Sequence, residues 1–420
     1  MHTLRLASAF ALALLACTVL TSFSPFEWAS AHSPFEWASA HAQKLAEVRK
    51  KVDRKTPTPK VTPKDQQERA PFNVEEQDAA AIPGIPDARV WGDSAADFVR
   101  LLPAGSGPWL AISGGGSDGA FGAGVLTGWT ESGTRPEFTV VTGVSIGALI
   151  APFAFLGPRY DEEVHKNFTT IGAADIFEDR VTRDSLFDFW PLKRLVEHRV
   201  TAKLLSEIAA EHARGRRLFV VTTNLDAGRR VVWNMGAIAT RGDEAALKLF
   251  REVLLASSSI PGFFSPVLIE VEANGKKFHE MHSDGTLTAP FFVMPESMLS
   301  ASTGSGSPFS QLYVIVNSKL GPEFSMPDRN IHGVLGRSIA VALTAALRAE
   351  LMLISVGAQR HGYALRIAHV DSAFNHPSRG PFDGKYMQAL YEFGVAAGKA
   401  DTAFGNALPD LSMRGSNKQQ

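Results

Sequence analysis

The length, composition and charge of the chain set the first limits on its structure and function. The sequence has 420 residues, of which 45% are hydrophobic and 20% charged, so a large core can form and a disordered chain is excluded. The 42 basic residues balance 43 acidic ones, and this net charge of −1 provides no chain-wide field for nucleic acid. Cys17 is the single cysteine, which excludes an intramolecular disulfide and a paired-cysteine metal or redox site.

The N-terminus has the layout of a secretory signal. An apolar run over residues 6–20 follows Arg5 and precedes small residues, and it is shorter than the ~20 residues of a spanning helix. We find no later stretch that qualifies as a spanning helix, so we do not expect an integral multi-span protein. We expect export to the periplasm, the outer membrane or the medium.

Two processing routes compete within residues 1–40, the predicted signal region. Residues 14–17, Leu-Leu-Ala-Cys, resemble a bacterial lipobox, in which Cys17 would be lipidated and the protein would be a lipoprotein. Alternatively, cleavage follows the A-x-A site at 29–31 or its copy at 38–40, because residues 24–32 recur unchanged as 33–41. The sequence leaves both routes open.

Residues 41–90 are polar and dotted with proline. Between Lys44 and Arg69 nine basic residues oppose four acidic ones, a net charge of +5. This composition predicts a flexible basic linker. Such a linker can also lie on an anionic lipid surface, where each basic residue contributes about 1 kcal/mol.

The apolar part of the chain begins with a strand, a glycine-rich turn and a helix. We predict a buried strand over residues 109–113, the turn over 114–119 and the helix over 120–129. A turn of this kind either cradles a phosphate at a helix N-terminus or offers its backbone N–H groups to a transient oxyanion.

The next strand decides between these two uses. Residues 138–142 predict a second buried strand, and a dinucleotide site would need Asp or Glu at its end. Instead, the strand leads into Gly143-Val144-Ser145-Ile146-Gly147, and residues 148–156 predict a helix. This GxSxG turn is typical of a nucleophile elbow, with Ser145 as the nucleophile.

The glycine-rich turn contains a second GxSxG match, centred on Ser117. We prefer Ser145 because the N–H of the residue after the nucleophile usually serves the oxyanion hole. After Ser117 that residue is Asp118, whose carboxylate would lie close to developing negative charge, whereas Ile146 is uncharged.

A serine nucleophile needs a base, and Asp284 has the most suitable surroundings. It follows a hairpin predicted over 267–281 with its turn at Asn274-Gly275, so it lies at a strand end. The 12 histidines do not single out a base by sequence. We interpret His279 and His282, which precede Asp284, as partly exposed strand residues, with orientation of Asp284 as the alternative.

Together these motifs resemble the patatin-like phospholipases. The resemblance is carried by GGGxxG at 114–119, GxSxG at 143–147 and Asp284-Gly285, in that order, and by residues 256–266 ahead of the aspartate. It implies an α/β protein with a three-layer α/β/α patatin-like fold and a central, mostly parallel sheet. We expect the catalytic domain at 109–320, and at 321–420 a C-terminal extension of helices and strands packed on the same domain.

The resemblance also implies the roles of the site residues. Ser145 would be the acylated nucleophile and Asp284 the proton acceptor, without a catalytic histidine, a metal or a cofactor. The motif glycines are Gly143, Gly147 and Gly285, and the oxyanion hole would be formed by Gly114, Gly115, Gly116, Ser117, Asp118 and Gly119. Many members of the family carry Arg or Lys where this chain has Asp118, and Ala or Gly where it has Thr286.

The sequence therefore predicts an enzyme, a hydrolase of carboxylic esters. It would cleave fatty-acyl esters of lipids as a phospholipase A or lysophospholipase, with a lipid ester and a phospholipid membrane surface as partners and no nucleic acid. One alternative is an α/β-hydrolase-type esterase whose Ser-His-Asp triad uses a downstream histidine, namely His332, His361, His369 or His376. The other is a catalytically silent envelope lipoprotein that binds lipid or other partners.

Overall fold

The computed structural model describes residues 69–300, 308–324, 326–327, 329, 331–400 and 402–406. The signal region, Cys17 and the linker up to residue 68 lie outside these residues, so export and lipidation stay predictions. The prediction of a flexible linker is wrong for residues 69–90. This segment contains helix α3 (Val74–Asp78), and Ile82, Ile85 and Ala88 are buried because they pack into the main hydrophobic core.

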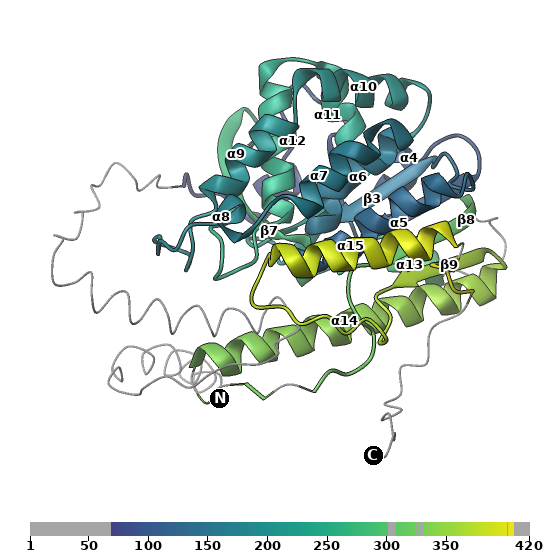
Figure 1. Ribbon diagram of the computed structural model, residues 1–420. Coiled ribbons are helices and arrows are strands. Elements are labelled where there is room, and N and C mark those ends of the chain that lie inside the picture. The colour runs from purple at the N-terminus through teal and green to yellow at the C-terminus, as the bar shows by residue number, and fades with distance from the viewer. Residues whose placement is uncertain are drawn as a thin grey trace, which may run out of the picture. The chain divides into compact units, whose positions relative to one another are not determined.

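A nine-stranded sheet runs through the middle of the fold (Figure 1). Its strands are β1 (Arg89–Trp91), β2 (Gly107–Ile112), β3 (Val140–Val144), β4 (Arg217–Asn224), β5 (Arg229–Asn234), β6 (Val267–Ala273), β7 (Lys276–Asp284), β8 (Phe309–Val316) and β9 (Ala364–His369). The central strands β4, β3, β2, β8 and β9 are parallel in that order. Beside β4, strands β5 and β1 and the hairpin of β6 and β7 add antiparallel pairs. The predicted mostly parallel sheet is confirmed.

Helices cover both faces of this sheet, because alternate residues of each central strand point to opposite sides. In β2, Leu110 and Ile112 join a larger core, whereas Trp109 and Ala111 join a smaller one. The helices on the larger core are α5 (Gly119–Glu131), α6 (Ile146–Leu156), α7 (Asp161–Thr169), α8 (Ala173–Ile176), α9 (Trp190–Arg199), α10 (Ala202–Ala213), α11 (Met235–Arg241), α12 (Glu244–Ser257) and α15 (Gly384–Lys399). The smaller core is covered by α4 (Ala95–Leu101), α13 (Glu296–Ser300) and α14 (Ile331–His361). The three-layer α/β/α architecture is therefore confirmed.

Helices α5 and α15 pack backbone against backbone. A Cβ on Gly124 of α5 would lie 2.1 Å from the carbonyl oxygen of Tyr391, and Gly128 is equally crowded one turn later. On α15, Gly394 and Gly398 meet the backbone of α5 in the same way. Since only glycine leaves room for this approach, the pair holds the C-terminal helix directly on the helix that follows the glycine-rich turn.

The C-terminal segment is built into the same sheet. Strand β8 pairs with β2, and β9 pairs with β8, so residues far apart in the sequence lie side by side in the centre of the fold. The apolar stretch of sequence at 339–359 lies within α14, which begins earlier, and residues 301–307 fall outside the described residues.

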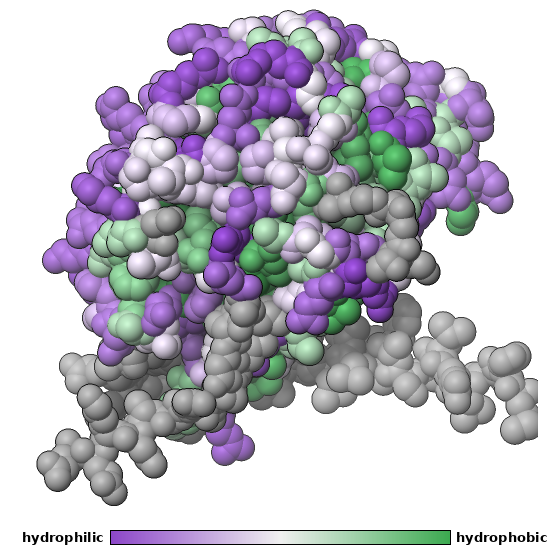
Figure 2. All heavy atoms as spheres, turned by 90° about the vertical axis from the view of Figure 1, so that its right-hand side faces the viewer, coloured by the Kyte–Doolittle hydropathy of each residue, from purple (hydrophilic) through white to green (hydrophobic). Residues whose placement is uncertain are grey.

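The surface combines hydrophilic regions with hydrophobic patches. The face in Figure 2 is largely hydrophilic along its outline, with hydrophobic residues gathered further in. Six of the 12 exposed large hydrophobic side chains found among the described residues fall between Phe324 and Val356. Within the same part of the chain, the helical stretch Gly336–His361 is long and apolar enough to cross a membrane. We expected no stretch after the signal to qualify as a membrane-spanning helix. That expectation is wrong, because this helix meets the requirements of length and apolar composition.

Candidate active site

Ser145 lies on the sharp turn between β3 and α6. Its φ of 55° and ψ of −124° are a strained combination for a residue with a side chain. The two motif glycines are needed because the turn is crowded. A Cβ on Gly143 would lie 2.4 Å from the carbonyl oxygen of Gly147, and one on Gly147 would lie 2.3 Å from that of Ile112. The turn therefore has the conformation that the GxSxG pattern predicted.

Asp284 ends strand β7 directly opposite the serine. The Ser145 hydroxyl donates to Asp284 Oδ2 over 2.7 Å, and both residues are buried. Asp284 Oδ1 accepts two further hydrogen bonds from Thr286, from the backbone N–H at 2.8 Å and from the hydroxyl at 2.7 Å. Gly285 is required here, because a Cβ would lie 2.4 Å from the carbonyl oxygen of Val221. The fold thus joins the two residues that the sequence proposed as nucleophile and base.

The environment of Asp284 moves its pKa towards neutrality. Burial raises the pKa to about 6, although the hydrogen bonds from Ser145 and Thr286 work in the opposite direction. Above this pH the carboxylate is ionised and can accept the proton of the Ser145 hydroxyl.

The glycine-rich turn wraps over Ser145 in a conformation that depends on glycine. Gly115 has a φ of 157°, and a Cβ there would lie 2.1 Å from the carbonyl oxygen of Asn317. A Cβ on Gly114 would lie 3.8 Å from the Ser145 hydroxyl oxygen, so the two turns touch. This contact places the backbone of the first turn beside the side chain of the second.

Of the six residues predicted for the oxyanion hole, three have backbone N–H groups that are already bonded. The N–H of Gly114 donates to Pro290, that of Asp118 to Gly115, and that of Gly119 within the same turn. The N–H groups of Gly115, Gly116 and Ser117 have no acceptor among the described residues. These three are therefore the donors that remain for an oxyanion.

Asp118 is buried beside this turn, and its carboxylate accepts a 2.8 Å hydrogen bond from the hydroxyl of Tyr386 on α15. Burial raises the pKa of Asp118 to about 7, although the hydrogen bond from Tyr386 lowers it. Below that pH the side chain is largely neutral. The negative charge of Asp118, which was the reason to prefer Ser145 over Ser117 as the nucleophile, is therefore largely absent below pH 7 and present above it.

Two cavities meet at Ser145. The larger, of about 280 Å³, is also bordered by Asp118, Asp284 and the glycine-rich turn, and it carries Lys319, Glu323, Arg337 and Arg348 further out. The smaller, of about 60 Å³, is apolar and is lined mainly by Ile146, Leu149, Ile176, Leu192, Ile260, Phe263, Phe264 and Phe382. The serine therefore lies between a larger cavity that carries charged side chains and a smaller one that is almost entirely apolar.

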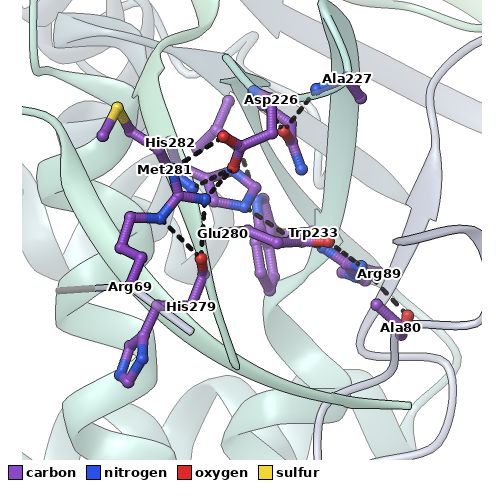
Figure 3. Close-up of polar contacts among 12 residues, drawn as sticks. Arg69, Ala80, Arg89, Asp226, Ala227, Trp233, His279, Glu280, Met281 and His282 are labelled. Carbon is purple, nitrogen blue, oxygen red and sulfur yellow. Dashed lines mark hydrogen bonds and ion pairs between the residues drawn. The ribbon is translucent and has the colours of Figure 1, made fainter. Parts of the chain in front are cut away.

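A polar network holds the strand that carries Asp284 (Figure 3). Arg69 donates to the carboxylate of Asp226 and to the carbonyl of His279, and Asp226 also accepts from the N–H of Met281. Between these two contacts on β7, the carboxylate of Glu280 forms a buried ion pair with Arg89. The N-terminal segment that was expected to be a flexible linker thus fixes β7.

His282 is fully buried, so the prediction of a partly exposed residue is wrong for it, whereas His279 is half-buried. The Nδ1 atom of His282 lies 2.9 Å from the hydroxyl of Thr222, and its Nε2 atom lies 3.2 Å from the carboxylate of Glu280. Burial lowers the pKa of His282, against the effect of Glu280, which favours a neutral ring that donates through Nε2. The interior position follows from the pairing of β7 with β4, which the sequence does not reveal.

Three residues of the site were not identified from the sequence. Ser257 accepts the backbone N–H of Ser145 at 3.0 Å, Thr286 bonds Asp284 as described, and Asn317 donates to the carbonyl of Ser113 at 2.9 Å. Asn317 directly follows the buried strand β8, and a polar residue in that position could have been recognised from the sequence as a site residue. Ser257 gave no signal beyond its place in a serine-rich run.

The histidines of the alternative triad lie elsewhere. No histidine lines either cavity among the residues that the structure describes. His369 and His376 face neighbouring backbone carbonyls, and His361 ends α14, while the side chain of His332 is outside the description. Nor is any group of three or more His, Cys, Asp or Glu side chains in the described part placed to hold a metal ion.

The fold is of the α/β/α class, and its candidate site joins a serine on a strained turn to a buried carboxylate. Residues 110–295 match the family model of the patatin-like phospholipases, so the chain contains a patatin-like phospholipase domain. The family identifies this domain in general terms as a lipid acyl hydrolase.

A search of solved structures finds similarity to VipD from Legionella pneumophila. The two share 12% sequence identity with a TM-score of 0.33, over 72% of this chain and 68% of that one. No curated protein matches the chain by sequence.

Proposed function

We propose that the chain is a serine hydrolase of phospholipase A or lysophospholipase type, working through Ser145 and Asp284. The observation that carries the proposal is the 2.7 Å hydrogen bond between the Ser145 hydroxyl and Asp284 Oδ2. The base contacts the nucleophile directly, so a third residue is not needed to relay the proton.

In the first half of the reaction, the ionised carboxylate of Asp284 accepts the proton of the Ser145 hydroxyl while the oxygen attacks the ester carbonyl carbon. The carbonyl oxygen becomes an oxyanion, which the N–H groups of Gly115 and Gly116 stabilise. The bond to the alcohol then breaks, and the alcohol leaves with the proton held by Asp284. The fatty acyl group stays on Ser145 as an ester.

In the second half, water attacks the acyl ester on Ser145, and Asp284 accepts a proton from that water. The same N–H groups stabilise the second oxyanion. When this intermediate collapses, the fatty acid leaves, and the Ser145 oxygen regains its proton from Asp284. Each turnover consumes one water and returns both side chains to their starting state.

The two cavities suit the two parts of a phospholipid. The first carbons of an acyl chain suit the small apolar cavity, because Leu149, Phe263 and Phe264 offer them no polar group. An anionic headgroup fits the larger cavity, where Arg348 lines the wall and its Nη2 is buried without a partner among the described residues. We place the leaving alcohol with its phosphate on that side, and we propose a phospholipid membrane surface, reached after export, as the place of action.

A covalent probe tests the proposal. A fluorophosphonate should label the protein at Ser145, as read by mass spectrometry of the digested chain, and labelling should cease in Ser145→Ala. Asp284→Asn should lower the labelling rate by at least a hundredfold, because it removes the base. Labelling at Ser117, the other GxSxG serine, or labelling of Asp284→Asn at the normal rate would show that the assignment is wrong.

A further inference from the structure

Helix α14 carries an apolar row that faces away from the protein. The row comprises Val334, Val341, Ala345, Ala349, Met352 and Val356, with Ser338 between them, whose hydroxyl donates to the carbonyl of Val334. These residues recur every three or four positions and so share one face. All are exposed, and the four large ones keep 50–55% of their surface. At 1.5 Å per residue the row is about 33 Å long.

The charged side chains of α14 do not break this row. Arg337 donates to the carbonyl of Glu323, Arg348 to that of Leu320, and Arg360 to that of Ser300. The fourth, Glu350, faces Arg230 and Glu296 on the protein side. A helix exposed to water usually shows the opposite arrangement, with charges outside and apolar residues inside. The exposed apolar side chains of the outer row would therefore be more stable in contact with an apolar surface than in water.

The same helix lines the larger cavity beside Ser145. Ala340, Leu347 and Arg348 face the cavity, and Val341 both borders it and belongs to the outer row. Just before the helix, Phe324 is 90% exposed and Met326 75% exposed, and Gly321 and Glu323 border the cavity. The mouth of the candidate site thus opens next to the apolar surface, which a substrate held in a lipid layer would need.

The charges at the ends of the row suit an anionic lipid surface. Arg329 before α14 and Arg360 in its last turn are both exposed, the latter with only its Nη1 bonded among the described residues, to the carbonyl of Ser300, and no acidic residue lies in the outer row. Arginine at the ends of an apolar helix can reach lipid phosphates while the apolar residues between enter the acyl region.

The packing of α14 argues against a helix that crosses a bilayer. Its inner face is anchored in the smaller core by Leu347, Leu351 and Ile354, and it packs against α13 and β9. A helix crossing a membrane would lose this core. Figure 1 shows α14 at one edge of the fold, beneath α15 and β9 in this view, with no described helix or strand beyond it. Only 22% of its most apolar stretch is buried, so it is not an ordinary core helix either.

We infer that the outer row of α14, with Phe324 and Met326, is a membrane-docking surface that rests on an anionic phospholipid bilayer and presents the mouth of the site to lipids. This inference rests on the proposed lipid hydrolysis. It adds which element meets the membrane and how the cavity is oriented towards it.

The test separates docking from catalysis by three measurements, namely binding to vesicles, hydrolysis of the same vesicles by the active chain, and hydrolysis of a soluble ester. Docking is measured with the full chain carrying Ser145→Ala, by sedimentation with vesicles of phosphatidylglycerol and phosphatidylcholine. Catalysis is measured with the active chain on a soluble short-chain ester. The test variant is Met352→Asp with Val356→Asp, because neither residue borders the two cavities. The control is Val99→Asp with Val181→Asp, two equally exposed valines elsewhere.

We expect the test variant to bind vesicles at least tenfold more weakly and to lose vesicle hydrolysis to the same extent, while its hydrolysis of the soluble ester stays within twofold. The control should match the unmodified chain in every assay. Unchanged vesicle binding by the test variant, or by its milder form Met352→Ser with Val356→Ser if the first does not fold, overturns the inference. So does a stable dimer that these substitutions dissociate, because a second copy would then cover the row. A chain that docks but cleaves neither substrate would refute the proposed function alone.

Discussion

The pH dependence of the reaction is set by the hydrogen bonds around Asp284. Its carboxylate must be ionised to accept the Ser145 proton, and its pKa is raised to about 6. Activity should therefore be low below pH 6 and rise as the pH passes through that value. The substitution Thr286→Val removes one of the donors to Asp284 Oδ1, the hydroxyl at 2.7 Å, and keeps the backbone donor at 2.8 Å.

The size of the effect follows from the kind of hydrogen bond. A bond to a charged group contributes about 1.5–3 kcal/mol, and one pKa unit corresponds to about 1.4 kcal/mol, so the pKa of Asp284 should rise by roughly one to two units. The direction is upward because the lost bond stabilised the ionised form. The acid limb of the profile should move from about pH 6 to roughly 7–8, while the rate at higher pH changes little.

The assay is kcat/KM for a soluble short-chain ester between pH 4.5 and 9 at constant ionic strength, with the released alcohol measured by chromatography. Thr288→Val is the matched control, because its hydroxyl pairs with Thr223 at 2.9 Å and not with the Asp284 carboxylate. Its limb should stay near pH 6. If the acid limb of the pH profile does not shift in Thr286→Val, or shifts to lower pH, this account of Asp284 is refuted. A limb near pH 4 in the unmodified chain would refute the effect of burial.

Three further predictions follow from other parts of the structure. Because ionised Asp118 adds negative charge to the cavity, kcat/KM should fall roughly tenfold above about pH 7, and Asp118→Asn should abolish this fall in the same pH series. Arg89→Leu leaves the buried Glu280 carboxylate without its ion-pair partner, with the hydrogen bond to His282 remaining. It should lower the free energy of unfolding by about 3–5 kcal/mol in urea titrations, against about 1 kcal/mol or less for the surface arginine in Arg229→Leu. Leu149→Trp should fill the apolar cavity, lowering kcat/KM at least ~tenfold for long acyl chains and little for short ones.

A different result would contradict each of these three predictions. An alkaline fall that persists in Asp118→Asn would assign it to another group. Equal loss of stability in the two arginine variants would mean that burial of the Glu280 pair has no special cost. Equal loss on short and long esters in Leu149→Trp would mean that the apolar cavity does not hold the acyl chain.

The sequence predicted the parts of the fold in which local pattern determines structure. The strand, turn and helix around Ser145 lie within a few residues of their predicted bounds, and the hairpin turn at Asn274-Gly275 has the positive φ values that these residues favour. The order of the motifs also indicated the right family, because glycine is required wherever two backbone segments touch, as at Gly115 and Gly147.

What the sequence did not reveal depends on contacts between distant segments. The burial of His282 follows from β7 pairing with β4, and Asn317 supports the glycine-rich turn only because β8 lies next to β2. Contacts between distant segments also decide which backbone N–H groups can serve an oxyanion, since the N–H of Gly114 already donates to the carbonyl of Pro290. The apolar composition of α14 likewise does not indicate which of its faces the smaller core covers.

The placement of β8 and α15 has a consequence for the order in which the site can form. Strand β8 supplies the neighbour of β2, and Tyr386 of α15 bonds Asp118 beside the glycine-rich turn. Ser145 and Asp284 are both made before these elements during synthesis, which runs from the N-terminus. Their surroundings are complete only when the last ~40 residues of the chain have been added. A growing chain therefore carries its reactive serine in an unfinished cavity, and a chain that stops before α15 lacks the Tyr386 hydroxyl that bonds Asp118 at the edge of it.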